Sequence, residues 1–127
     1  MSKLVQISDA EWVVMEALWR RGSATAADVI SDLVDARDWN HRTVRTLLTR
    51  LVGKGALLAK ATGNKYVYRP AISREKCVRA ESRSFLAKVF GGNTAEMLVH
   101  FVRDAKISGE EIEHLRQVLD EKLSDRQ

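Results

Sequence analysis

Several features that would set this chain apart from ordinary globular proteins are missing from its sequence. The 127 residues include one proline, seven glycines and one cysteine, Cys77. One cysteine excludes an internal disulfide framework and fits a reducing compartment, so we expect a cytoplasmic protein. The most hydrophobic run, Trp12 to Trp19, is broken by Glu16 and is far shorter than the roughly 18 residues that a membrane span needs. We therefore expect no membrane span, and the N-terminus lacks the apolar stretch of a secretory signal.

Motifs for catalysis and metal binding are also missing. The three histidines, His41, His100 and His114, are scattered, and the sequence has no Cys-x-x-Cys or His-x-x-x-His spacing. Zinc sites normally need such paired ligands, so we expect no metal site. The sequence has no glycine-rich phosphate loop and no nucleophile motif of the hydrolases. These absences favour a binding protein without a cofactor over an enzyme.

Positive charge is present, and it is concentrated in one segment. The whole chain carries 21 Lys+Arg and 17 Asp+Glu, a net charge of +4. Residues 37–72 hold eight bases and a single acid, Asp38, a net charge of +7, whereas residues 73–127 hold ten bases and ten acids. A local basic patch of this kind is typical of a surface that binds a polyanion such as nucleic acid. A solvated surface without a ligand is the alternative.

Capping residues and hydrophobic spacing predict three helices in the first part of the chain. The segment that begins at Ser8 is a capping box for a helix that stops at Gly22. Thr25 opens a second helix, and Asn40 is a good N-cap for a third that ends at Gly55.

A hairpin is expected after the third helix. Short strands at 56–61 and 66–69 flank a Gly-Asn dipeptide, and glycine supplies the positive φ that a tight two-residue turn needs. Tyr66 and Tyr68 share one face of this hairpin, and we expect both in the core. Three helices followed by a hairpin is the order of a winged helix, a variant of the helix-turn-helix.

The predicted third helix has an apolar face and a basic, hydroxyl-rich face. At about 100° per residue, four aliphatic residues between Val44 and Leu51 lie together, and the opposite face has no acid. Arginine donates two hydrogen bonds to the edge of a guanine, and threonine offers a hydroxyl group and a methyl group to thymine. We expect major-groove contacts from Arg42, Thr46 and Thr49, with Arg45 on the flank, and phosphate contacts from Thr25, His41, Thr43, Arg50, Lys60, Asn64 and Lys65.

The C-terminal part predicts three amphipathic helices with a small core. One spans 73–89, and capping boxes that begin at Asn93 and Ser108 open the other two. So short a segment forms little core alone, and a twofold partner would cover its apolar faces while matching a palindromic site. A self-contained antiparallel bundle is the alternative. The residues expected in the dimer interface are Phe85, Phe101, Val102, Ile112, Leu115, Leu119 and Leu123.

The predicted fold is therefore mainly α. A winged helix-turn-helix domain that binds DNA is expected at 1–72, with three helices and a β-hairpin wing. C-terminal dimerisation helices are expected at 73–127. The residue patterns predict a protein that binds double-stranded DNA as a homodimer.

Several motifs, in the same order along the chain, resemble one known family. They are Ile7-Ser8-Asp9-Ala10-Glu11-Trp12 near the start, Trp39 before the third helix, Thr46-Leu47-Leu48 with Arg50-Leu51 within it, and Ser84-Phe85-Leu86 with Val89-Phe90-Gly91-Gly92 near the end. Together they are similar to the penicillinase repressor family, over about residues 7–123.

This resemblance implies a bacterial winged-helix repressor that dimerises through its C-terminal helices on a palindromic operator. It also implies release by a regulatory protease in a β-lactam response. The family's cleaved Asn-Phe bond corresponds here to His100-Phe101, so the phenylalanine matches and the asparagine does not. The copper-responsive branch of the family has paired cysteines near its C-terminus, and this chain has none there.

Two other functions fit the same pattern of residues. One is a winged-helix regulator that responds to a ligand or metal, which needs a polar cavity or a ligand cluster. The other is a protein-interaction adaptor that binds no nucleic acid, whose partner binding would survive high salt.

Overall fold

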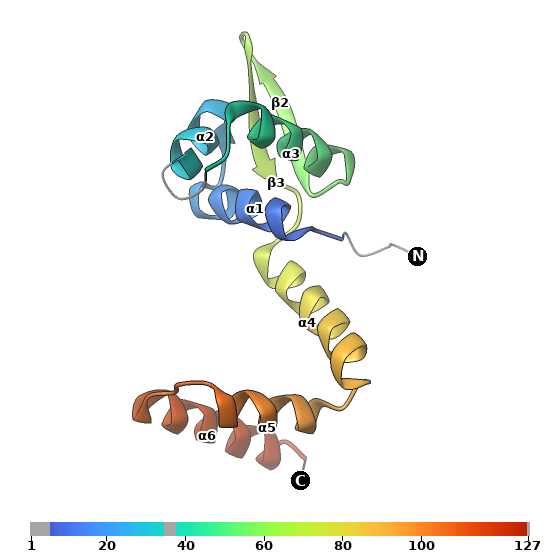
Figure 1. Ribbon diagram of the computed structural model, residues 1–127, viewed down its shortest axis with the longest axis vertical. Helices are drawn as coiled ribbons and strands as arrows, with labels where there is room; N and C mark the ends of the chain where they lie inside the picture. The colour runs from blue at the N-terminus through green and yellow to red at the C-terminus, as the bar shows by residue number, and fades with distance from the viewer. Residues whose placement is uncertain (1–5, 35–37, 127) are drawn as a thin grey trace. The chain divides into compact units, whose positions relative to one another are not determined.

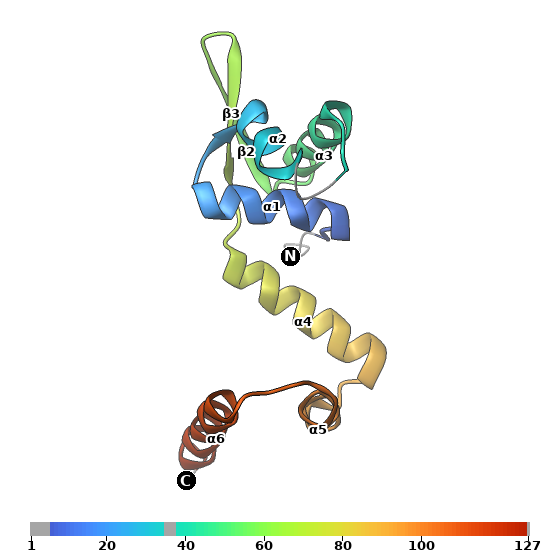
Figure 2. The ribbon, with the colours of Figure 1, turned by 60° about the vertical axis from the view of Figure 1, so that its left-hand side comes forward.

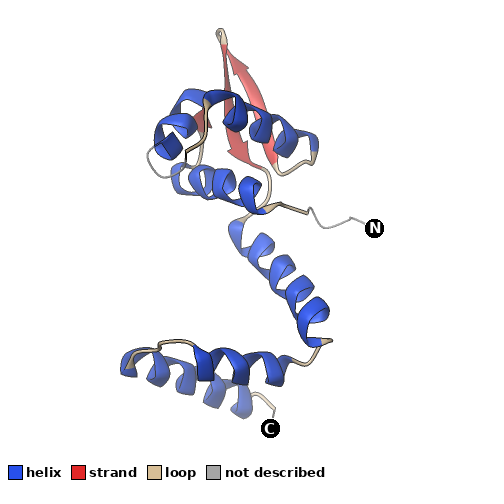
Figure 3. Cartoon of the chain, viewed as in Figure 1, coloured by secondary structure: helices blue, strands red, loops and turns tan. Residues whose placement is uncertain are grey.

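The computed structural model describes residues 6–34 and 38–126 (Figures 1 and 3). Arg37, a base of the basic segment, lies outside the described residues. The mainly helical fold with a small antiparallel sheet confirms the predicted fold class. The elements are α1 (Asp9–Arg21), β1 (Ala24–Thr25), α2 (Ala26–Val34), α3 (His41–Gly53), β2 (Leu57–Thr62), β3 (Lys65–Pro70), α4 (Arg74–Phe90), α5 (Thr94–Asp104) and α6 (Gly109–Ser124).

The helix starts follow the predicted caps. The Ser8 hydroxyl accepts a hydrogen bond from the Glu11 backbone N–H, and the Glu11 carboxylate accepts one from the Ser8 N–H. The same reciprocal pair opens α6 at Ser108, whereas at Asn93 only the side-chain contact to the Glu96 N–H is seen. Asn40 caps α3, which ends at Gly53, slightly before the predicted Gly55.

The sheet has three strands in the order β1-β3-β2, all antiparallel. The predicted hairpin is present, with a two-residue turn in which Gly63 has φ +64°. The strand β1 was not predicted, because two residues are too few to show an alternating pattern. It pairs Ala24 with Tyr68 and Thr25 with Val67, so the sheet continues directly into the start of α2.

The core of the first part lies between α1, α2, α3 and the base of the hairpin (Figures 1 and 2). Its fully buried side chains include Met15, Leu18, Leu48 and Leu57. The prediction for the two tyrosines is half wrong. Tyr68 packs against this core, but Tyr66 is 58% exposed, because the hairpin extends beyond the helices that could cover it.

The chain divides into two compact units, residues 1–82 and 83–127. The first turns of α4 are tied to α1. The Trp19 indole donates to the Ile72 carbonyl at 3.0 Å, and Arg74 pairs with Glu16 at 3.1 Å. Cys77, in the next turn, is buried. These contacts join the start of α4 to the first unit.

The second unit contains the end of α4 with α5 and α6. None of the described residues of α5 or α6 is buried. Its main cluster is aromatic, with Phe85 stacked on Phe101 at 6.0 Å between ring centroids and Phe90 beside both. A self-contained bundle would bury a seam along α5 and α6, so that alternative is wrong for the single chain.

No helix in the described part of the chain combines the length and the hydrophobicity that crossing a membrane requires.

Candidate nucleic-acid interface

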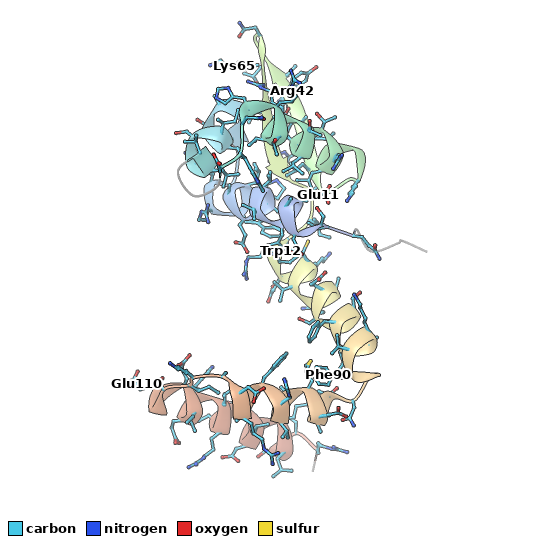
Figure 4. The ribbon with its side chains drawn as sticks, viewed as in Figure 1. Glu11, Trp12, Arg42, Lys65, Phe90 and Glu110 are labelled. Atoms are coloured by element: carbon cyan, nitrogen blue, oxygen red, sulfur yellow. The ribbon has the colours of Figure 1, made fainter. Side chains whose placement is uncertain are left out.

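The helix α3 presents the two faces that the sequence predicts. Val44, Leu47, Leu48 and Leu51 are buried against α1 and α2. The opposite side is exposed (Figure 4). A shallow groove on that side is lined by Arg42, Arg45, Thr46, Thr49 and Arg50. We call these five residues the α3 outer face.

The arginines of the α3 outer face are available for a ligand. Within the part of the chain that the structure describes, no ion pair or side-chain hydrogen bond engages Arg42, Arg45 or Arg50. An arginine held by a carboxylate would have to exchange that partner for DNA. These side chains would lose no ion pair on binding DNA, so they are available to contact phosphates and base edges.

The threonines of α3 differ in their free hydrogen-bonding groups. The Thr49 hydroxyl donates to the Arg45 carbonyl at 3.0 Å, and the Thr43 hydroxyl donates to the Asn40 side chain at 3.2 Å. The Thr46 hydroxyl has no partner among the described residues. Thr46 can therefore donate to a base, whereas Thr49 is left with its methyl group and an accepting oxygen.

The hairpin separates its basic residues from its tyrosines. Lys60 pairs with Val67 and Lys65 pairs with Thr62, so both lysines lie on the face opposite Tyr68. Both are exposed, and Asn64 lies in the turn beyond them. The wing residues predicted to contact phosphates thus lie at its tip and on its outer face, and two of them, Asn64 and Lys65, also line a cleft beside α3.

A cleft of about 230 Å³ lies between the wing, the start of α2 and α3. It contains no carboxylate among its lining residues, which are Thr25, Ala26, Ala27, Arg45, Asn64, Lys65, Tyr66 and Tyr68. Tyr66, which the residue pattern assigns to the core, is exposed in this cleft instead. The residue pattern does not predict the short strand β1. This strand pairs with β3 only as far as Val67 and so leaves Tyr66 uncovered.

Thr25 is already engaged at the start of α2. Its hydroxyl accepts from the Asp28 N–H at 3.2 Å, and the Asp28 carboxylate accepts from the Thr25 N–H at 3.0 Å. These hydrogen bonds hold the pKa of Asp28 below its ordinary value. The structure thus places a carboxylate beside the amides that were predicted to bind a phosphate.

Lys54 belongs to the basic segment but does not face outward with the other bases. Its ammonium lies 2.6 Å from the carboxylate of Glu11, a residue that is only 2% exposed. Burial raises the pKa of Glu11, but the hydrogen bonds from Lys54 and Ser8 outweigh it, so this pKa lies below its ordinary value. Lys54 therefore holds the end of α3 on α1.

His41 is not one of the residues that line the groove along α3. His41 is exposed at the first position of α3. The seven predicted interface residues lie in the second unit, and all are at least 39% exposed: Phe85, Phe101, Val102, Ile112, Leu115, Leu119 and Leu123.

The predicted cleavage pair lies inside a helix. His100 and Phe101 are both in α5, where His100 contacts the Asp104 carboxylate at 3.2 Å. Phe101 belongs to the aromatic cluster with Phe85 and Phe90.

Comparisons with known proteins agree with this arrangement. Residues 7–121 match the penicillinase repressor family. The penicillinase repressor of Bacillus licheniformis is 38% identical over 121 residues, covering 95% of this chain and 94% of that protein. The methicillin resistance regulatory protein MecI of Mammaliicoccus sciuri is 34% identical, with 95% and 98% coverage.

The winged-helix unit also has solved relatives. One is the monomeric form of Bacillus licheniformis BlaI in complex with the blaP half-operator, with a TM-score of 0.52 and 39% identity. That similarity covers 60% of this chain and 93% of the other. Sequence similarity along almost the whole length, together with this shared fold, leads to one conclusion: the chain belongs to the penicillinase repressor family.

Proposed function

We propose that this protein is a sequence-specific DNA-binding transcriptional repressor that places α3 in the major groove of an operator. The observation that carries the proposal is the α3 outer face, where three arginines without ion-pair partners among the described residues surround Thr46 and Thr49. The solved structure of its relative BlaI is a complex with the blaP half-operator. Its similarity to this chain supports operator binding by the winged-helix unit here. The proposed place of action is the cytoplasm.

The proposal includes a homodimer formed by the second unit. The single chain leaves Phe101, Ile112, Leu115, Leu119 and Leu123 at least 40% exposed. Burying a side chain of this kind contributes about 1.5–3 kcal/mol, so a second copy is the natural cover for this surface. Two copies of α3 would then match the two halves of a palindromic operator.

The proposal also includes release by a regulatory protease in a β-lactam response. A cut between His100 and Phe101 would remove the end of α5 and all of α6 from the chain. The dimer seam would be lost with them, and operator affinity depends on joining two half-site readers. In cells exposed to a β-lactam, mass spectrometry should find a fragment that ends at His100, and an intact chain would overturn this part.

The experiment that tests DNA binding is a footprint on the DNA upstream of the protein's own gene. Purified protein should protect an inverted repeat, and sedimentation should give a dimer on one repeat. Protection of no sequence, even at low ionic strength, would overturn the proposal.

Two further experiments test the alternative functions. Equilibrium dialysis with metals tests the ligand-responsive regulator, and partner binding that survives high salt would favour the adaptor. Among the described residues, no group of three or more His, Cys, Asp or Glu side chains is arranged to hold a metal ion.

A further inference from the structure

Tyr66 lies on the inner face of the wing, beyond the part of the sheet that other elements cover. Tyr66 and Tyr68 are two residues apart in β3, so they share one face of the strand. Tyr68 packs against the core, but β1 pairs only as far as Val67, and Tyr66 is 58% exposed. A phenol group is therefore left accessible on the side of the wing that faces the helices.

Arg45 connects this phenol to the α3 outer face. Its side chain belongs to the groove along α3 and also lines the cleft that contains Tyr66. No carboxylate lines that cleft, and Arg45 has no ion-pair partner in the described part of the chain. Two cationic side chains, Arg45 and Lys65, thus share one small space with the Tyr66 phenol at the junction of α3 and the wing.

We propose that Arg45 and Tyr66 bind the same phosphodiester of the DNA strand, so that α3 and the wing hold one phosphate between them. The inference rests on the proposed DNA-binding function. A guanidinium donates two N–H groups to phosphate oxygens, and a phenol O–H donates a third hydrogen bond. Such a contact fixes the register of α3 in the groove and is blind to base sequence.

The test begins with Tyr66→Phe, which removes only the hydroxyl. Binding of the full-length protein to two duplexes, the footprinted repeat and a scrambled repeat of equal composition, is measured by fluorescence anisotropy over a salt series. We expect about three- to tenfold weaker binding to both duplexes. The slope of log affinity against log salt should stay unchanged, because the phenol carries no charge.

Ser82→Ala is the control, since it removes an exposed hydroxyl group from α4 at a position that does not line the cleft. It should bind both duplexes as the wild type does. The urea midpoint of Tyr66→Phe should equal that of the wild type, because its hydroxyl has no partner among the described residues.

A double-variant cycle tests whether the two residues share one phosphate. After Arg45→Ala, adding Tyr66→Phe should weaken binding by less than about twofold, because the shared contact is already lost. After Arg42→Ala, the same change should keep its full effect, since Arg42 does not line the cleft.

Full additivity of Arg45→Ala with Tyr66→Phe would overturn the shared phosphate, as would wild-type affinity of Tyr66→Phe. In either case the wild type still protects its repeat, and the proposed function stands. A wild type that binds neither duplex refutes the proposed function and this inference together.

Discussion

The Oε1 atom of Glu11 lies 2.6 Å from the Nζ atom of Lys54 and joins the first turn of α1 to the residue that ends α3. The same ammonium donates to the Gln6 carbonyl at 2.9 Å. The carboxylate is buried, whereas the side chain of Lys54 is 39% exposed. This ion pair fixes the end of α3 on the body of the winged helix, so it is a contact of stability rather than of DNA binding.

Glu11→Gln should destabilise the protein by about 1–3 kcal/mol, because a charged hydrogen bond to a buried acceptor is lost while the shape is kept. Urea unfolding measures the change. Glu75→Gln is the control: Glu75 is exposed and has no side-chain partner among the described residues, so its midpoint should not move.

Glu11 should also affect how the free energy of unfolding depends on pH under acidic conditions. Because the folded pKa of Glu11 is depressed, its contribution is present above the ordinary glutamate pKa of 4.5 and is lost as the pH falls through the folded value. Asp28 and Asp32, whose pKa values are also lowered, act in the same direction. Between pH 5 and 3, stability measured by urea should fall less steeply in Glu11→Gln than in the wild type. Equal slopes would contradict this role.

Arg42→Ala should weaken operator binding by about 1–3 kcal/mol and relax the choice of base at one position in each half-site. The reason is that Arg42 is exposed on the α3 outer face and is free to fork onto a guanine. Affinities for repeats with each base changed in turn provide the measurement. A variant that keeps the base preferences of the wild type would remove Arg42 from the major groove.

Lys65→Ala should weaken binding to specific and scrambled duplexes alike, because its charge lies at the tip of the wing, where we expect contacts with phosphates and none with bases. The slope of log affinity against log salt should fall by about 1. Thr62→Ala, the pairing partner on the same face, tests whether removing any side chain there has this effect. An unchanged slope would take Lys65 off the list of phosphate contacts.

Leu119→Glu should split the dimer, since Leu119 is 60% exposed in the single chain and is placed in the proposed seam. Sedimentation should give a monomer that still binds a half-site but binds the full repeat about 10²-fold or more weakly. Gln117→Glu adds the same charge about 200° around the helix and should remain a dimer. A dimeric Leu119→Glu would place the seam elsewhere.

The local features of the chain were readable from its residues alone. Ser8 and Asn40 begin their helices because a side-chain oxygen beside unpaired backbone N–H groups is a local arrangement that needs no tertiary contact. The split of α3 into a buried side and an exposed side follows from its 3.6-residue period in the same way. The exposure predicted for Arg42, Arg45, Thr46 and Thr49 is thus confirmed, and their contacts with DNA stay predictions.

The contacts between distant segments were decided only by the tertiary structure. In the sequence Lys54 is one more base of the basic segment, but in the structure it forms an ion pair with Glu11, 43 residues away. Tyr66 and Tyr68 lie on the same face of β3, but β1 pairs only with Tyr68 and Val67. Tyr66 is therefore left uncovered. The hydrogen bond from the Trp19 indole to the Ile72 carbonyl joins residues 53 positions apart and holds the segment before α4 against α1. A pattern of residues fixes which face of an element is apolar, but only the packing of the whole chain fixes what lies against that face.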